Sequence, residues 1–416
     1  MYGQRMLTAE DIARLGHAAD PESRLASACG GKHRNTSRTV KRALIASRKR
    51  ILYPCYITQC PMWDKQTLTS KRRPLAIRPP HETLEAIIDS GNEAHFTTFD
   101  STQAAFHADL AAWASQLMIT LTGAWACLAL WGDMAPSTKS DSIMLLLFTI
   151  MNGFSRQRYW VTCLNKSSIC QCGCFGRCTF TEIFSVVAWS ARALAARRWP
   201  RVDHLGRSFP FNSFRRRMGG KRLRVGAAIL RKYGDWEWFK RSLNLRGWGD
   251  GTRRLCCWLC GASKLYDPFA FNSALDAPWR ATTVSTLRYW QEALTSNSYI
   301  SPLFQLPGWR LEFCAPDFMH VVCLGVLLVA FGNPLVPLFK ALKGTKRSWR
   351  KACGRLHNMM ALAAGDLGVD TPIRLLTLRM IWFAAKQPCM RVKAKEARDL
   401  LPVVHHMLLN FFQPLK

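Results

Sequence analysis

Four cysteines that lie within nine residues carry the strongest metal-binding signal in the sequence. The four are Cys170, Cys172, Cys174 and Cys178. Gly173 and Gly176 stand between them and give the backbone room to fold around an ion. Four thiolates can close the tetrahedron that Zn²⁺ prefers, so the cluster predicts a zinc site. The alternative is a cysteine-rich turn in which only some of the thiols bind metal.

A second set of ligand types occurs further along the chain. Cys257 and Cys260 form a C-x-x-C pair, and Asp317 and His320 form a D-x-x-H pair. Two thiolates, one imidazole and one carboxylate would complete a second zinc site. The alternative is that Asp317 and His320 cap a buried helix that continues through residues 321–328.

The charge balance favours a polyanionic partner. The 416 residues include 58 Lys and Arg against 27 Asp and Glu, a formal net charge of +31. Such an excess indicates DNA, contacted mainly through its phosphates. No small-molecule substrate is evident, and an oligomer is left open. The candidate phosphate contacts are Arg215, Arg216, Arg217, Lys221, Arg222, Arg224, Lys346, Arg347 and Arg350.

Cysteine usage and the N-terminal sequence predict a reducing compartment. The 16 cysteines are too sparse for a disulfide scaffold, and the first thirty residues lack the apolar core of a secretory signal. Arg198, Arg201 and the run 215–217 are candidate nuclear-import patches, so we expect a nuclear protein.

Apolar blocks separated by turns predict an α/β fold. Residues 126–131, 143–151 and 158–163 are typical of strands and could form a meander. The sequence from Thr179 to Glu182 has the pattern of a capping box that opens a helix ending near Arg198. Residues 225–230 then predict another strand, which delivers Asp235 to its end.

Two uncharged stretches raise the alternative of a multi-span membrane protein. Residues 110–132 are long enough to cross a bilayer, but their second half also has the pattern of a buried strand. Residues 321–339 contain two prolines and two glycines, which favour a bent, buried segment over a span. A membrane protein is therefore not the favoured interpretation.

Composition shifts divide the chain into four expected parts. Residues 1–94 alternate basic runs with turn residues and predict a loosely ordered basic arm. Residues 95–250 should hold the first part of the core with the cysteine cluster. Residues 251–380 should form a largely helical insertion with the C-x-x-C and D-x-x-H pairs, and residues 381–416 a C-terminal core helix.

Several motifs in order resemble the core of the CACTA (En/Spm) transposases. They are Gly234-Asp235, the C-x-x-C at Cys257–Cys260, SPLFQLPGW at 301–309 and APDFMHVVCLG at 315–325. Most of residues 125–415 is also similar to a multicopy protein family of dinoflagellate algae, which itself resembles this core. That similarity includes CQCGCFGRC at 170–178, LGVLLVAFGN at 324–333 and KAKEARDLLP at 393–402.

The resemblance implies an RNase H-like core, a mixed sheet flanked by helices, with a DDE-type catalytic triad. Its first carboxylate maps to Asp133, with Asp141 as second choice, its second to Asp235 and its third to Glu396. The residue after Glu396 is Ala397 instead of the family's Trp, and Trp238 stands where the family has a small residue. These departures permit an active site that has lost its activity.

Three carboxylates that converge from two strand ends and a helix can bind two divalent ions, for which Mg²⁺ or Mn²⁺ is suited. The first hypothesis is therefore DNA strand cleavage and transfer, as in DNA recombination. The second is a domesticated DNA-binding protein without catalysis, and the third is the membrane protein. Metal-dependent nicking separates the first two.

Overall fold

The computed structural model describes residues 53–91, 104–136, 141–153, 157–245, 257–263, 274–295, 299–317, 319–343, 349–370, 373–382 and 389–412. The chain divides into two compact units, Met1–Ala315 and Pro316–Lys416, each with its own hydrophobic cluster. These bounds differ from the four expected parts. Residues 53–91 contribute to the core of the first unit, and residues 381–412 contribute to the core of the second.

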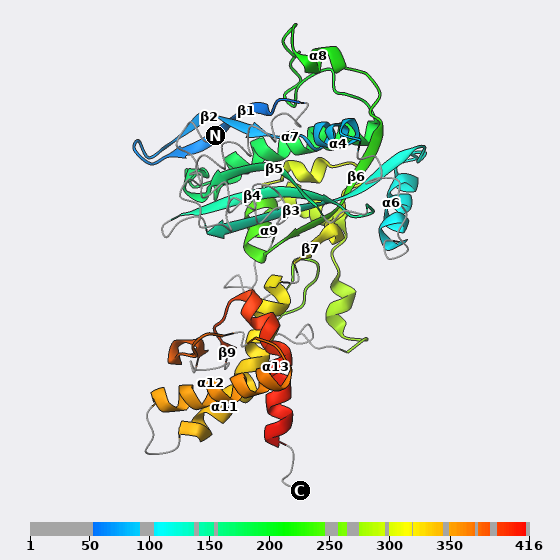
Figure 1. Cartoon of the computed structure of the whole chain (residues 1–416). Coiled ribbons are helices and arrows are strands. Elements are labelled where there is room, and N and C mark those ends of the chain that lie inside the picture. The colour runs from blue at the N-terminus through cyan, green and yellow to red at the C-terminus, as the bar shows by residue number, and fades with distance from the viewer. Residues whose placement is uncertain are drawn as a thin grey trace. The chain divides into compact units, whose positions relative to one another are not determined.

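A five-stranded mixed sheet is the centre of the first unit, with strand order β5-β4-β3-β6-β7 (Figure 1). Strands β3, β4 and β5 form the expected antiparallel meander, and β6 runs parallel to β3. All four strands predicted from the apolar blocks are present. The five strands of the sheet are β3 (Ala124–Pro136), β4 (Ser142–Ile150), β5 (Arg158–Asn165), β6 (Val225–Gly234) and β7 (Cys314–Pro316).

Both faces of the sheet are covered by helices, which explains why its central strands are almost continuously apolar. Alternate side chains of β3 enter two different clusters: Ala126 and Leu128 face α7 (Arg177–Ala196), whereas Trp125 and Cys127 face α6 (Ala104–Gln116). The two-residue period of a strand therefore serves two cores at once.

Helix α7 is buried on nearly all sides because a second layer covers it. That layer consists of the hairpin β1 (Tyr56–Asp64) and β2 (Thr69–Ile77) together with α4 (Pro80–Asp89). Tyr56, Met62, Ile77 and Leu84 are all buried in the main cluster. The expectation of a loosely ordered arm is therefore wrong for residues 53–91, and residues 1–52 lie outside the described ones.

Shorter elements complete the first unit. Helix α8 (Phe214–Met218) precedes β6, α9 (Trp236–Leu243) follows it, and α10 (Thr286–Thr295) lies further along. Single 3₁₀ turns occupy Lys166–Ser168, Pro278–Thr282, Pro302–Gln305 and Leu311–Phe313.

The second unit is mainly helical. A π-helical turn (Met319–Val326) leads into α11 (Leu327–Lys343), which packs with α12 (Trp349–Asp366) and α13 (Ala394–Phe412). Two short strands, β8 (Ile381–Trp382) and β9 (Cys389–Met390), pair antiparallel after the 3₁₀ turn Leu378–Met380.

The two apolar stretches have different outcomes. Residues 110–132 do not form one helix, since they comprise the end of α6, a turn and most of β3, so a span here is contradicted. The helical stretch Met319–Lys343 is long and apolar enough to cross a membrane. An 18-residue window within it has a mean hydropathy of 2.2, and 39% of that window is buried. Among the described residues it is the one such helix, and a buried core helix meets the same criteria.

Candidate functional site

Two of the predicted carboxylates lie at the same edge of the sheet. Strands β3 and β6 are parallel, and their last paired residues are Trp131 and Tyr233. Asp133 and Asp235 each follow two residues later. Asp235 comes directly after β6, whereas Asp133 stands within β3, which continues to Pro136 in its pairing with β4. Ligands and catalytic groups of α/β sheets commonly gather at such an edge. We call this place the carboxylate edge.

The glycine before each of these aspartates makes room for one aromatic ring. A Cβ on Gly132 would lie 1.8 Å from Cε2 of Trp238, and a Cβ on Gly234 would lie 2.4 Å from its Cδ1. Trp238 is 5% exposed and meets Phe180 and Phe184 of α7 edge to face. The large residue at position 238, a departure from the transposase pattern, is thus accommodated by the two glycines.

Asp235 also has a structural role. It is the N-cap of α9, and its Oδ1 accepts a hydrogen bond of 2.5 Å from the Trp238 N–H. An Asp N-cap satisfies a helix N–H that has no partner within the helix, and it opposes the positive end of the helix dipole. Asp133 is exposed on β3, where its Oδ1 accepts from the N–H of Met134 at 2.6 Å.

Asp141, the second choice for the first carboxylate, is held by a turn. Its Oδ2 accepts from the Ser167 hydroxyl at 2.5 Å, and its Oδ1 accepts from the Ser142 N–H at 2.9 Å. Although partial burial opposes the change, these hydrogen bonds hold the pKa of Asp141 below its usual value. Asp141 stands directly before β4, which pairs with β3 and not with β6, so Asp133 is the candidate on the strand next to Asp235.

Glu396 belongs to the second unit, on the first turn of α13. Its Oε2 accepts a hydrogen bond of 2.8 Å from the N–H of Lys393, and this hydrogen bond caps the start of α13. Asp133 and Asp235 belong to the first unit, and the convergence of Glu396 with them stays a prediction.

The cysteine cluster has the geometry of a metal centre. The sulfur atoms of Cys170, Cys172, Cys174 and Cys178 all lie within 4.8 Å of one another. The distance between Cys172 Sγ and Cys178 Sγ is 3.8 Å, about the edge of a tetrahedron with Zn–S bonds of about 2.3 Å. These four thiols could hold a metal ion such as zinc, and the predicted ligand set is brought together completely.

Backbone conformation explains the compact loop. Gly173 and Gly176 have φ of +87° and +88°, a region open mainly to glycine. A Cβ on Gly176 would also come within 2.7 Å of the Ile169 side chain. Hydrogen bonding from the Cys178 backbone and the neighbouring thiols lowers the pKa of Cys174 to about 7, although burial opposes this. The contacts among the thiols raise the pKa of Cys172, and burial together with those contacts raises the pKa of Cys178. A thiolate is the form that binds metal.

Helix α7 begins directly at this loop, and not through the expected capping box. The N-cap is Gly176, without a side-chain cap. Thr179 Oγ1 instead donates to the Pro61 carbonyl at 2.6 Å and accepts from the Cys170 N–H at 2.9 Å. The capping-box prediction was wrong because both of its side chains have partners in β1 or in distant loops, which outweigh the local pattern.

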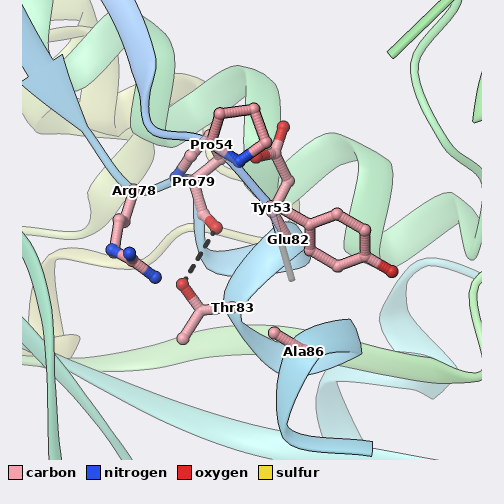
Figure 2. A pocket seen from close by; sticks show the side chains of 7 residues that line it. All are labelled: Tyr53, Pro54, Arg78, Pro79, Glu82, Thr83 and Ala86. Atoms are coloured by element: carbon pink, nitrogen blue, oxygen red, sulfur yellow. Dashed lines mark hydrogen bonds between the residues drawn. The ribbon is translucent and has the colours of Figure 1, made fainter. Parts of the chain in front are cut away.

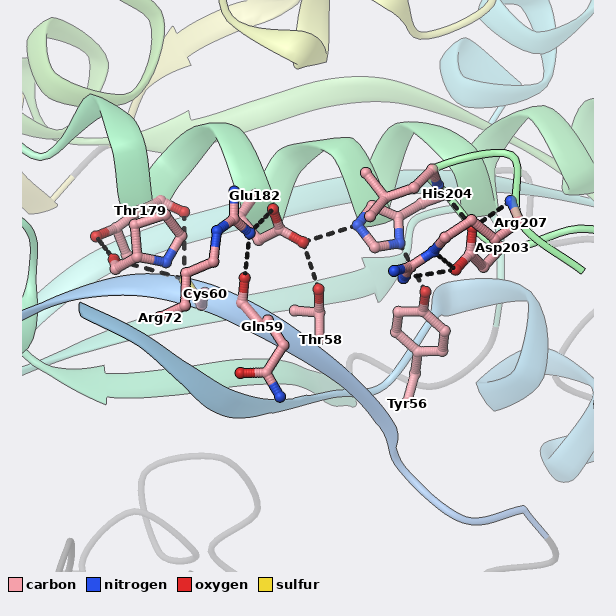
Figure 3. A network of polar contacts seen from close by, with 12 residues as sticks. Tyr56, Thr58, Gln59, Cys60, Arg72, Thr179, Glu182, Asp203, His204 and Arg207 are labelled. Atoms are coloured by element: carbon pink, nitrogen blue, oxygen red, sulfur yellow. Dashed lines mark hydrogen bonds and ion pairs between the residues drawn. The ribbon is translucent and has the colours of Figure 1, made fainter. Parts of the chain in front are cut away.

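Glu182 is part of a buried polar network that the sequence did not reveal (Figure 3). Its Oε1 lies 2.7 Å from His204 Nε2 and also accepts from the Thr58 hydroxyl. His204 Nδ1 lies 2.6 Å from the Tyr56 hydroxyl. If Nε2–H donates to the carboxylate, Nδ1 accepts from the tyrosine. The network joins β1, α7 and the loop after α7, so it fastens the hairpin to the core.

The C-x-x-C pair is attached to the helix that Asp235 caps. Trp258, between Cys257 and Cys260, meets Trp236 and Phe239 of α9 at ring-centroid distances of 4.1 and 5.0 Å. Burial raises the pKa of Cys257 to about 11. The two cysteines therefore lie in the first unit, anchored by an aromatic cluster.

The D-x-x-H pair lies in the second unit and has the geometry of a helix cap. Asp317 Oδ1 accepts from the His320 N–H at 3.1 Å, and Asp317 Oδ2 lies 2.6 Å from His320 Nδ1. The cap geometry is that of the capping alternative, but the helical turn that follows is not buried as that alternative expected: Cys323 is the only buried residue of Met319–Val326. A joint site of Asp317 and His320 with the cysteine pair of the other unit stays a prediction.

The predicted phosphate contacts separate into two kinds. The guanidinium of Arg215 binds both carboxylate oxygens of buried Glu82, at 2.6 and 2.8 Å, and Arg224 pairs with Glu85 and Asp89. The other described candidates are exposed: Arg216, Arg217, Lys221, Arg222 and Arg350. Lys346 and Arg347 lie outside the described residues.

A small hollow beside Glu82 is not a substrate site. Tyr53, Pro54, Arg78 and Pro79 line it together with Glu82, Thr83 and Ala86 (Figure 2). Its volume is about 10 Å³, roughly that of one water molecule. A ligand larger than water would not fit.

No protein-family model matches the chain, and no curated protein matches it.

Proposed function

We propose that this chain is a nuclear DNA-binding protein derived from a CACTA-type transposase, with an RNase H-like core in its first unit. The support is topological. Three antiparallel strands are followed by a helix and then by a strand that pairs parallel with the first. A mixed sheet flanked by helices is what the resemblance implies for an RNase H-like core.

The observation that carries the proposal is the position of Asp133 and Asp235. Each stands two residues beyond the last residues that pair β3 with β6, Trp131 and Tyr233. Two carboxylates, one from the last part of β3 and one directly after the neighbouring β6, are the donor set that the first two positions of a DDE site require. Mg²⁺ or Mn²⁺ bound there would activate water and stabilise the leaving 3′ oxygen of a DNA strand.

A second candidate is a DNA-binding protein without catalysis, and one observation favours it. Asp235 already caps α9, and the bulky Trp238 lies against the two glycines of the carboxylate edge. A helix cap alone is a sufficient reason for an aspartate at position 235. In this case the fold and the charge serve binding only.

Nicking of supercoiled plasmid by the full chain, with Mg²⁺ or Mn²⁺, separates the two candidates. Asp235→Asn is the informative variant because asparagine still caps a helix but removes the charge that a metal requires. We expect Asp235→Asn and Asp133→Asn to abolish nicking while the affinity for DNA stays equal or rises. The matched control is Glu237→Gln, which removes an exposed carboxylate of the same helix α9.

The outcomes are distinct. Wild-type protein that binds DNA but nicks nothing with any divalent ion supports the binding protein. Full activity of Asp133→Asn removes that residue from the site. Protein that does not bind DNA at all contradicts the proposal as a whole.

A further inference from the structure

The segment between the end of α7 and the start of β6 is the most basic part of the described chain. Residues 197–224 contain ten Arg and Lys and a single acidic residue, Asp203. Four of the cations have internal partners. Arg197 donates to the carbonyls of Thr122 and Arg224, and Arg207, Arg215 and Arg224 pair with carboxylates. These four stabilise the fold.

The other six cations are exposed, and we call them the α8 patch. They are Arg198, Arg201, Arg216, Arg217, Lys221 and Arg222. In the described part of the chain, no ion pair joins any of the six to a carboxylate. Arg198 donates to the backbone carbonyl of Gly220, and Arg217 donates to that of Asn212. These hydrogen bonds position the two side chains without neutralising their charge.

Backbone pairing brings the segments of Arg198, Arg201, Lys221 and Arg222 together, and α8, which precedes Lys221 in the chain, carries Arg216 and Arg217. The Trp199 N–H donates to the Lys221 carbonyl at 2.9 Å, and the Gly220 N–H donates to the Trp199 carbonyl at 2.9 Å. Arg198 and Arg222 are partners in a β-bridge. Arg201 lies against Gly220, where an added Cβ would come 2.8 Å from its Nε. The dipole of α7 places only about half a negative charge at the C-terminus of that helix, which is too little to account for six cations.

The α8 patch and the carboxylate edge lie at opposite ends of β6. Helix α8 precedes the strand and α9 follows it, so the whole of Val225–Gly234 separates them (Figure 1). Ten residues of strand span about 30 Å, the length of about nine base pairs of duplex DNA. The patch therefore cannot hold the phosphate group that would be cleaved at the carboxylate edge.

We propose that the α8 patch is a separate binding site for the phosphate backbone of duplex DNA, which holds DNA at a distance from the carboxylate edge. This deepens the proposed function and rests on it. Affinity and cleavage then depend on different residues of the same unit. The contacts are to phosphates, so binding at the patch is independent of base sequence.

Binding of a labelled duplex of about thirty base pairs to the full chain, over a range of salt concentrations, tests the proposal. The variant is Arg216→Gln, Arg217→Gln, Lys221→Gln and Arg222→Gln together. The control removes the same charge from four exposed cations elsewhere: Lys65→Gln, Lys166→Gln, Lys340→Gln and Arg374→Gln. Thermal unfolding of each protein confirms that it is folded.

We expect the patch variant to bind at least roughly tenfold more weakly at 0.1 M salt, with a salt slope smaller by about three to four. The control and Asp235→Asn should stay within about twofold of wild type. Equal losses in the patch variant and the control would overturn the patch while leaving DNA binding in place. No DNA binding by wild type would contradict the proposed function itself. Binding to phosphatidylserine vesicles but not to DNA would overturn both proposals and assign the patch to a membrane surface.

Discussion

The indole ring of Trp238 lies so close to Gly132 that any side chain at position 132 would overlap it, with a Cβ only 1.8 Å from Cε2. Gly132→Ala should therefore destabilise the first unit by more than about 2 kcal/mol, because neither β3 nor the buried ring can move easily. Combining it with Trp238→Ala should remove this extra cost, since the cavity accepts the methyl group. Chemical denaturation of the two single variants and the double variant measures the coupling. Additive losses would show that the ring and the glycine are independent.

Removing two thiols of the cysteine cluster should release its metal. We expect about one zinc ion per chain in the purified protein and little in Cys172→Ser/Cys174→Ser, as measured by elemental analysis. Cys55→Ser/Cys389→Ser is the control, because these cysteines are only partly buried and lie outside the cluster. Zinc content that is equal in all three proteins would contradict a site at these residues.

Arg215 and Arg216 are neighbours in sequence but should respond differently to substitution. Arg215→Gln leaves the buried Glu82 without its cation, so we expect a loss of about 2–4 kcal/mol in unfolding free energy. Burial already raises the pKa of Glu82, and protonation of the carboxyl will soften the loss. Arg216→Gln should change stability by less than about 0.5 kcal/mol. Urea denaturation compares the two, and similar losses would refute the division into structural and exposed cations.

Lys232 should destabilise the first unit near neutral pH. It is 2% exposed, its Nζ has no hydrogen-bond partner among the described residues, and its nearest rings, Trp309 and Phe313, lie at 5.1 and 5.7 Å. Burial lowers its pKa from 10.5 to about 8. Lys232→Met should therefore raise stability by about 2–3 kcal/mol at pH 7.

The stability gained by Lys232→Met depends on pH because the pKa of Lys232 differs between the unfolded and the folded protein. The unfolded lysine stays protonated up to about pH 10.5, whereas the folded one loses its proton near pH 8. The cost of burying the charge is complete below pH 8 and disappears as the pH rises to about 10.5. The advantage of Lys232→Met should shrink over that range in urea denaturation, with Lys166→Met as an exposed control. An advantage that does not change with pH would mean that packing, and not charge, is responsible.

The sheet could be predicted from sequence because its strands are apolar blocks bounded by turns. The same rule missed the hairpin, since Pro61 and Pro74 interrupt its strands and β2 is basic and exposed. Prolines are tolerated there because, within the described residues, the hairpin forms a two-stranded sheet of its own.

The site was predictable only where its residues are close in sequence. The four cysteines of one loop were found together, and so was the end of β6 at Asp235. The parallel pairing that brings Asp133 beside Asp235 joins residues about a hundred positions apart, so it followed from resemblance alone. The prediction that Glu182 belongs to a capping box was wrong because its partners, Thr58 and His204, lie on other segments of the chain.

The hairpin that covers α7 has a consequence for how the chain is made. Tyr56 and Thr58 leave the ribosome more than a hundred residues before Glu182 and His204, their partners in the network. Until then, the hairpin has an apolar face with nothing to pack against, and two strands alone are marginal in water. We expect the first unit to fold only after α7 and the loop behind it have been synthesised, and a nascent chain stalled before residue 180 to remain sensitive to protease across residues 56–77.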